Sequence, residues 1–310
     1  MKLPTKVTIK EVGPRDGLQN ESKFIDTKDK IEWINRLSKT GLSYIEVSSF
    51  VHPKWIPQLA DSEEVLKSIQ KKPGVTYAAL VPNIRGLERA LNCQVDEISV
   101  FMSASEGHNK QNINKTIDET FPVLKEVVDE AKKANVKVRG YVSTVIACPY
   151  DGLVAPKQVL KVADRLFDMG VYEVSLGDTI GVGVPTQVES LLETLLKHFP
   201  PNLLAMHFHD TRGTALANVL KSLEMGITTF DSSTGGLGGC PYAKGASGNV
   251  ATEDLNYMLS AMHIETGINP EALIDSAFFM EEKIGKILIS KQMEIARNER
   301  SGNLDNARTV

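Results

Sequence analysis

The chain contains few cysteines and no long apolar segment. Its three cysteines, Cys93, Cys148 and Cys240, have a spacing that fits neither a disulfide framework nor a metal finger, so a reducing compartment is expected. No run of apolar residues approaches the length of a membrane span. A strand pattern begins almost at the first residue, which leaves no room for a signal or transit peptide. We therefore expect a protein with no membrane partner that is cytoplasmic, or whose targeting segment has been removed.

The sequence also lacks a strong charge of either sign and a dinucleotide-binding fingerprint. Its formal net charge is −4, so no large positive field is available to attract nucleic acid, and we expect no nucleic-acid partner. No GxGxxG motif follows the first expected strand, which argues against a dinucleotide there. Hydrophobic residues make up 42% of the 310 residues, which is typical of a soluble protein with a sizeable core.

What the chain does contain is a regular alternation of short apolar segments and longer amphipathic ones. The apolar segments are rich in Val, Ile, Tyr and Phe and end at glycine or polar residues, which predicts strands at residues 7–12, 44–48, 76–80, 97–102, 137–143, 173–176, 204–208 and 229–232. Apolar residues at helical spacing, bounded by proline or glycine, predict helices that include residues 29–39, 117–134, 156–169, 185–198 and 214–225.

Eight strands that alternate with helices predict an α/β fold, a closed (β/α)8 TIM barrel. An open doubly wound sheet is the alternative. We expect the barrel to occupy residues 1–264 and a C-terminal helical extension, residues 265–310, to pack on it. A helical stretch at 270–291 lies in this extension, and the tail from Arg297 is polar and expected to be mobile.

Two histidines on the seventh expected strand are the strongest local sign of chemistry. His207 and His209 are two residues apart, so both side chains face the same side of the strand, while Met206 and Phe208 face the other. Catalytic groups of a barrel gather at the carboxyl ends of its strands. The pair therefore predicts a metal site at the barrel mouth; two hydrogen-bonded core histidines are the alternative.

Asp16 is the candidate carboxylate for this site. It lies in an Arg-Asp-Gly sequence just after the first expected strand, where it is also typical of a plain turn. With two histidines opposite, it suits an ion that completes its shell with oxygen or water. Mg²⁺, Mn²⁺ and Zn²⁺ all remain open on this donor set.

A glycine-rich segment follows the eighth expected strand. Residues 235–249 contain six glycines, which favours a mobile lid or an anion-binding loop over a plain connection. Cys240 lies within this segment. It could be an exposed, reactive thiol, although a cysteine of unknown pKa is more often inert.

Four segments of the chain resemble 3-hydroxy-3-methylglutaryl-CoA (HMG-CoA) lyases. They are VGPRDGLQNE at 12–21, SLGDTIG at 175–181, HFHDT at 207–211, and GGCPYAKGASGN at 238–249, which ATED follows at 251–254. The resemblance extends to about residue 259. The RDG and HxHD elements alone are shared with isopropylmalate, homocitrate and citramalate synthases and with metal-dependent aldolases, whereas the glycine-rich loop is much more specific to the lyases.

The resemblance implies a role for each matched residue. A divalent cation, Mg²⁺ or Mn²⁺, would be held by Asp16, His207, His209 and Asn249. Arg15 would neutralise the thioester oxygen as an enolate forms, and Gln19 would support the metal ligands. Proton transfer and substrate orientation would fall to Glu46, Asp178 and His207, with Cys240 near the reacting carbon and Glu253 beside it. Position 212 is Arg, where many relatives carry an aromatic residue.

The implied reaction is a retro-Claisen cleavage of HMG-CoA to acetyl-CoA and acetoacetate, a step of leucine degradation and ketone-body formation. A base must take the C3 hydroxyl proton and an acid must quench the carbanion. Because a metal-bound imidazole has its lone pair committed, we favour Asp178 as the base over His207. The resemblance also implies a homodimer, and it leaves the preferred acyl group and the native metal open.

Three other functions remain as alternatives. A Claisen-type synthase would use the same centre with acetyl-CoA and a 2-keto acid, but such synthases usually carry a further C-terminal domain for which 310 residues leave no space. A metal hydrolase usually has its His-x-His pair on the first strand. A non-catalytic scaffold would have lost polar groups that are all present here.

Overall fold

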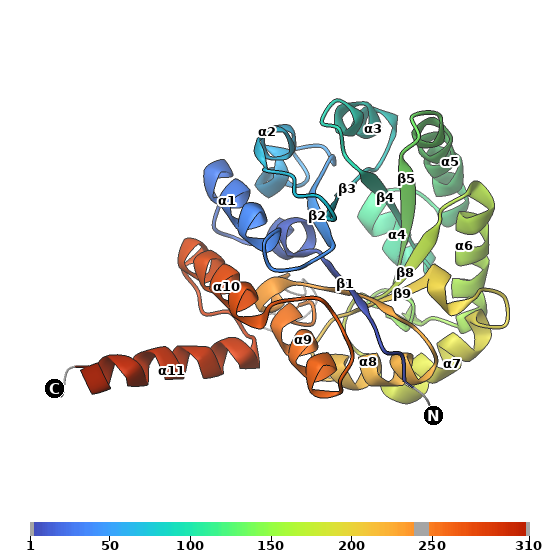
Figure 1. Cartoon of the computed structure of the whole chain (residues 1–310). Coiled ribbons are helices and arrows are strands. Elements are labelled where there is room, and N and C mark those ends of the chain that lie inside the picture. Colours follow the sequence, from blue (N-terminus) through green and yellow to red (C-terminus); the bar gives the residue numbers. More distant parts are fainter. Residues whose placement is uncertain (1–2, 239–247, 308–310) are drawn as a thin grey trace.

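Eight parallel strands form a closed barrel in the computed structural model, which describes residues 3–238 and 248–307, with side chains to Ser301 (Figure 1). The strand order around the barrel is β1-β10-β9-β8-β5-β4-β3-β2. The strands are β1 (Thr8–Glu11), β2 (Tyr44–Ser49), β3 (Thr76–Leu80), β4 (Glu97–Ser103), β5 (Lys137–Ser143), β8 (Glu173–Asp178), β9 (Leu204–Phe208) and β10 (Thr229–Ser232). The predicted (β/α)8 barrel is therefore confirmed.

Helices surround the barrel on its outside, as Figure 1 shows. They are α1 (Thr27–Leu37), α2 (Ser62–Ser68), α3 (Ile84–Leu91), α4 (Glu106–Ile113), α5 (Ile117–Lys133), α6 (Pro156–Met169), α7 (Pro185–Leu195), α8 (Ala215–Glu224) and α9 (Thr252–Ala261). Apart from α4, whose buried residues are His108 and Asn109, their apolar faces lie on the outer faces of the strands and complete a hydrophobic core. A short hairpin of β6 (Ala147–Cys148) and β7 (Gly152–Leu153), which the sequence did not reveal, follows β5.

The strand register sets which side chains meet inside the barrel. His207 of β9 lies beside Asp231 of β10 on one side and Gly177 of β8 on the other. Because alternate residues of a strand face the interior, His207 and Asp231 both point inward. This row lies near the carboxyl ends of the strands, where a barrel carries its functional groups.

The C-terminal region differs from its prediction. The expected helical stretch 270–291 ends early, because Gly285 adopts a positive φ of 75° and ends α10 (Pro270–Ile284). A further helix, α11 (Lys291–Ala307), begins at residue 291. Residues 297–307, for which the sequence predicted no helix, continue α11. Helix α10 contacts α1 and α9, and α11 contacts α9 and α10 near its start before it projects away from the barrel (Figure 1).

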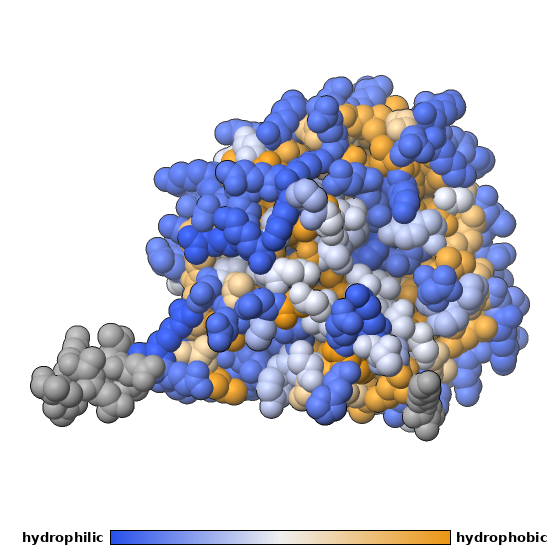
Figure 2. Space-filling view, in the orientation of Figure 1, coloured by the Kyte–Doolittle hydropathy of each residue, from blue (hydrophilic) through white to orange (hydrophobic). Residues whose placement is uncertain are grey.

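Polar residues cover most of the molecular face in Figure 2, with smaller apolar areas between them. Exposed apolar side chains include Trp55, Tyr257, Ile287 and Ile289. Among the described residues, no helix combines the length and the apolar character that crossing a bilayer requires.

Candidate metal centre and active site

A single π-helical turn at Gly13–Gly17 places Arg15 and Asp16 at the barrel mouth. The backbone amides of Arg15 and Asp16 both donate to the carbonyl of Val12, 3.1 and 2.7 Å away, so the chain turns sharply after β1. A Cβ atom on Gly13 would lie 2.5 Å from Glu11 Oε1, and one on Gly17 would lie 2.8 Å from Ser233 Oγ. A larger residue at either position would force these side chains to shift, which favours the glycines that flank the Pro-Arg-Asp sequence.

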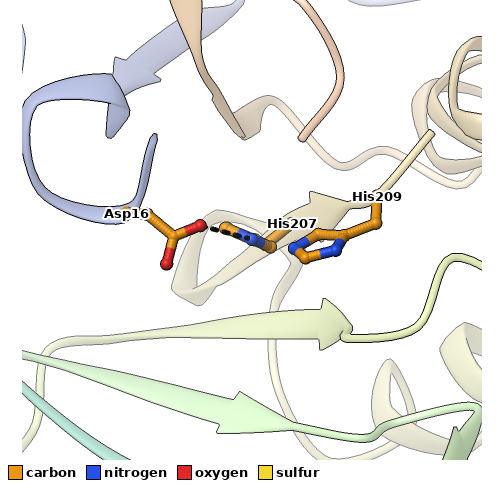
Figure 3. A group of neighbouring side chains, drawn as sticks. All are labelled: Asp16, His207 and His209. Atoms are coloured by element: carbon orange, nitrogen blue, oxygen red, sulfur yellow. Dashed lines mark ion pairs between the residues drawn. The ribbon is translucent and has the colours of Figure 1, made fainter. Parts of the chain in front are cut away.

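Asp16, His207 and His209 form a buried cluster (Figure 3). One ligand atom from each residue lies within 4.8 Å of the other two. His207 Nε2 is 3.9 Å from Asp16 Oδ2, and the centroids of the two imidazole rings are 5.3 Å apart. The sequence predicted that these three side chains converge, and they do.

Asn249 and Gln19 complete the surroundings of Asp16. Asn249 Nδ2 donates to Asp16 Oδ2 over 2.8 Å and to the carbonyl of Leu237 over 3.0 Å. Gln19 Nε2 donates to Asp16 Oδ1 over 3.2 Å. Asn249 is brought here by a β-bridge with His209. Both residues therefore contact the candidate ligand Asp16.

The donor set of the cluster fits a divalent cation. Asn249 Oδ1 and His209 Nδ1 are buried and have no hydrogen-bond partner within the part of the chain that the structure describes. Buried polar atoms are rarely left unpaired, and such atoms beside a carboxylate often mark an ion site. One carboxylate, two imidazoles and an amide oxygen suit Mn²⁺ or Zn²⁺, and Mg²⁺ with added oxygen ligands.

The electrostatics of the cluster keep its ligands in the forms that bind a cation. Burial alone would raise the pKa of Asp16, but the positive charge of Arg15, with smaller contributions from the two histidines, lowers it to about 2. Burial lowers the pKa of His209 to about 4, and His207 adds to this effect. At neutral pH Asp16 is therefore ionised and His209 is neutral.

Arg15 is held by an ion pair on each side. Its Nε donates to Glu46 Oε2 over 2.6 Å, and its Nη1 donates to Asp16 Oδ1. Its guanidinium lies 5.2 Å from the centroid of the Tyr141 ring. Tyr141 Oη also donates to Glu46 Oε2 over 3.2 Å. Arg15 is thus a fixed positive charge beside the metal cluster, and Glu46 is its anchor.

Asp178 ends β8 on the same rim. Its carboxylate accepts hydrogen bonds from the backbone amides of Gly183, over 2.8 Å, and Val182, over 3.3 Å. Burial nevertheless raises the pKa of Asp178 above its usual value, and the interaction with His207 only partly opposes this rise. Arg212 lies on the neighbouring loop, where its Nη1 donates to the carbonyl of Ile180. A raised pKa moves Asp178 toward the range of a general base.

Glu253 lies outside the metal cluster, at the start of α9. Both of its carboxylate oxygens accept from the backbone amide of Gly235, at 2.8 and 3.0 Å. Glu11, which the sequence analysis missed, accepts from Thr234 and Thr252 and supports the same turn. The two buried carboxylates hold the turn that leads into the glycine-rich segment. Cys240, in that segment, lies outside the described residues.

Because the pKa of Glu253 is raised, we expect the stability of the protein to depend measurably on pH. Burial, together with the charge of Glu11, raises the pKa of Glu253 from 4.5 to about 8. Between these two pH values, Glu253 holds a proton in the folded protein and releases it in the unfolded chain. The stability that the protonated Glu253 contributes is therefore lost as the pH rises from about 4.5 through 8. Between pH 6 and 8.5 we expect the free energy of unfolding to fall on the order of 2–3 kcal/mol from this group.

The test is urea unfolding of the wild type and Glu253→Gln across this pH range. The variant carries no titrating carboxyl and should show a flatter profile. Identical pH profiles for the two proteins would rule out this assignment.

Four interior residues behind the cluster were missed by the sequence analysis. They lie in one hydrogen-bonded group that reaches His207: Arg139, Tyr141, Ser175 and Asp231. Arg139 and Tyr141 are two apart on β5, which is the same periodic signal that identified His207, on β9, and His209, just after it. The sequence could have predicted that both side chains face the interior. It could not have predicted their partners, which lie on strands far away in the chain.

Fold and cluster together define a (β/α)8-barrel protein with a candidate cation centre at its mouth. A family model described as HMGL-like matches residues 6–279. The chain belongs to this family.

Relatives agree with this assignment. The chain is 58% identical to hydroxymethylglutaryl-CoA lyase YngG of Bacillus subtilis (strain 168), over 96% of this chain and 100% of the relative. It is 53% identical to a 3-hydroxy-3-isohexenylglutaryl-CoA/hydroxy-methylglutaryl-CoA lyase of Pseudomonas aeruginosa, over 92% and 95%. The crystal structure of a Bacillus subtilis HMG-CoA lyase superposes with a TM-score of 0.95 at 58% identity, covering 96% of this chain and all of that one. The predicted family and enzyme class are thereby confirmed.

Proposed function

We propose that this protein cleaves HMG-CoA into acetyl-CoA and acetoacetate with the help of one divalent cation. The observation that carries the proposal is the fixed positive charge of Arg15 beside the Asp16, His207 and His209 cluster. Relatives with 50–58% identity that bear HMG-CoA lyase names support the substrate. The reaction would serve leucine degradation and ketone-body formation, in the cytoplasm and as a homodimer.

Asp16, His207, His209 and Asn249 would hold the cation. When bound, the cation would supply a Lewis acid that stabilises negative charge on the substrate's hydroxyl and carboxylate oxygens. Gln19 would hold Asp16 in place through its hydrogen bond. The cation would be Mg²⁺ or Mn²⁺.

Arg15 would bind the thioester oxygen, where negative charge develops as the C2–C3 bond breaks. A donor fixed before the reaction stabilises the transition state more than the ground state, because it does not have to reorganise. Glu46 would keep Arg15 aimed by its 2.6 Å ion pair. Its other oxygen, Oε1, is buried with no partner among the described residues, so it would also be able to orient the substrate.

Asp178 would take the C3 hydroxyl proton. Its pKa is raised by burial, whereas His207 is engaged on both sides, by Asp231 at Nδ1 and by the cluster at Nε2. His207 is the rival base. Cys240 would lie near the reacting carbon and would protonate or shield the acetyl-CoA enolate. Glu253 would act through the turn that leads to Cys240 rather than by contact with the substrate.

The test is a panel of thioesters with purified protein and Mg²⁺ or Mn²⁺. We expect acetoacetate from HMG-CoA and a loss of this activity on addition of EDTA. 3-Hydroxy-3-isohexenylglutaryl-CoA should be tested in parallel, because the name of a related lyase contains both substrates. The shape of the pocket decides which acyl group is accepted. Absence of acetoacetate, or turnover that survives EDTA, would reject the proposal. Release of free CoA from acetyl-CoA and a 2-keto acid would instead identify a synthase.

A further inference from the structure

The two histidines of the candidate metal centre have different surroundings. His207 Nδ1 lies 3.2 Å from Asp231 Oδ2, while Nε2 of the same ring faces Asp16. His209 Nδ1, by contrast, is buried and has no hydrogen-bond partner in the described part of the chain. A carboxylate therefore supports one imidazole of the pair and not the other.

Asp231 is itself held firmly. Arg139 binds it with two nitrogens, Nη2 to Oδ1 over 2.8 Å and Nη1 to Oδ2 over 3.2 Å. Ser175 Oγ donates to Oδ2 over 2.6 Å. Both the Asp231 and the Arg139 side chains are fully buried. A two-point guanidinium pair fixes the plane of a carboxylate as well as its position.

This arrangement determines the tautomer of His207. An ionised carboxylate only accepts hydrogen bonds, so His207 Nδ1 must carry the hydrogen that it donates to Asp231. In the neutral ring Nε2 then keeps its lone pair, and this is the atom that faces Asp16. The nitrogen available to a cation is thus selected by a residue behind the ring.

We propose that Asp231 is a positioning residue that holds His207 in the Nδ1–H tautomer and so prepares Nε2 for the cation, with Arg139 and Ser175 fixing Asp231. This inference rests on the cation centre of the proposed function. It gives the buried Arg139–Asp231 pair a role in metal affinity, in addition to any role in stability.

Asp231→Asn is the decisive substitution. The asparagine can still accept from Arg139 with its oxygen, and its amide can then donate to His207 Nδ1. His207 would be driven to the Nε2–H tautomer, which has no lone pair toward the cation. Asparagine behind a catalytic histidine can stabilise the wrong tautomer in this way. We expect Mn²⁺ affinity to fall roughly 10–100-fold, the range for loss of such a supporting group.

Glu173→Gln is the matched control. Glu173 also binds Arg139, at Nε over 2.6 Å, and is also buried, but its hydrogen bonds run to Arg139 and Lys10. A general disturbance of the interior ion pairs would affect both variants. An effect through His207 would affect only Asp231→Asn.

Two measurements decide the matter. Mn²⁺ affinity is measured by EPR of free Mn²⁺ in the wild type and both variants. The His207 tautomer is read from ¹⁵N NMR of the metal-free, histidine-labelled protein, with His207→Gln used to assign the signal. We expect Nδ1–H in the wild type, Nε2–H with weakened Mn²⁺ binding in Asp231→Asn, and wild-type behaviour in Glu173→Gln.

The proposal is overturned by an Nε2–H tautomer in the wild type, by unchanged Mn²⁺ affinity in Asp231→Asn, or by equal losses in both variants. The wild-type tautomer remains a test even if Asp231→Asn does not fold. If the wild type binds no Mn²⁺, the proposed function fails, while the metal-free NMR measurement still tests the contact between Asp231 and His207.

Discussion

Replacing Arg15 with glutamine will lower kcat by about a hundred- to thousandfold, which corresponds to about 3–4 kcal/mol of lost transition-state stabilisation. The guanidinium is held by Glu46 and Asp16 and lies near the Tyr141 ring, so its charge is fixed beside the metal cluster before the reaction begins. Glutamine keeps part of the shape and removes the charge. The measurement is steady-state kinetics of acetoacetate formation, with the metal affinity of the variant determined alongside.

Arg36→Gln provides the comparison for Arg15. Arg36 forms an exposed i,i+4 ion pair with Glu32 on the outer helix α1, and its loss should leave kcat within error of the wild type. If Arg15→Gln keeps a near-normal kcat while it folds and binds metal, Arg15 does not stabilise the enolate. If kcat falls only because the metal is lost, its role is to hold Asp16.

Replacing Asp16 with asparagine will weaken Mn²⁺ binding by at least about a hundredfold. Asp16 is the one carboxylate of the cluster within the described residues, and its pKa of about 2 keeps it charged throughout the neutral range. The amide that replaces it supplies no charge and also breaks the pairing with Arg15. Loss of a residue that only supports a ligand already costs roughly 10–100-fold in metal affinity, so loss of a direct ligand should cost more. Titration by EPR or calorimetry measures the effect.

Asp61→Asn separates metal binding from stability. Asp61 is a largely buried carboxylate that pairs with Lys30 beside α1, far along the chain from the cluster ligands. Its loss should lower the unfolding temperature and leave Mn²⁺ affinity unchanged, because removal of one partner leaves a buried charge unpaired. An Asp16→Asn protein with wild-type Mn²⁺ affinity would remove Asp16 from the ligand set and leave the proposed chemistry without its centre.

Much of the barrel could be predicted because its signals are local. Strands 76–80, 137–143, 204–208 and 229–232 were predicted with the bounds that the structure shows. The convergence of His207 with His209 followed from strand phase alone, and that of Asp16 from its place after the first strand. The end of the chain was predicted less well. The helix at 291–307 is mostly polar, so its sequence has little of the apolar periodicity from which helices are predicted.

The sequence by itself determined the order of strands and helices, the shared orientation of His207 and His209, and the family. Each of these follows from patterns of residues that are close together in the chain. The tertiary structure alone decided which interior side chains touch. Arg139, Ser175, Asp231 and His207 come from four different strands, and Glu11 reaches Thr234 from the other end of the barrel sequence. Such contacts depend on barrel closure and strand register, which bring together residues that no local pattern relates.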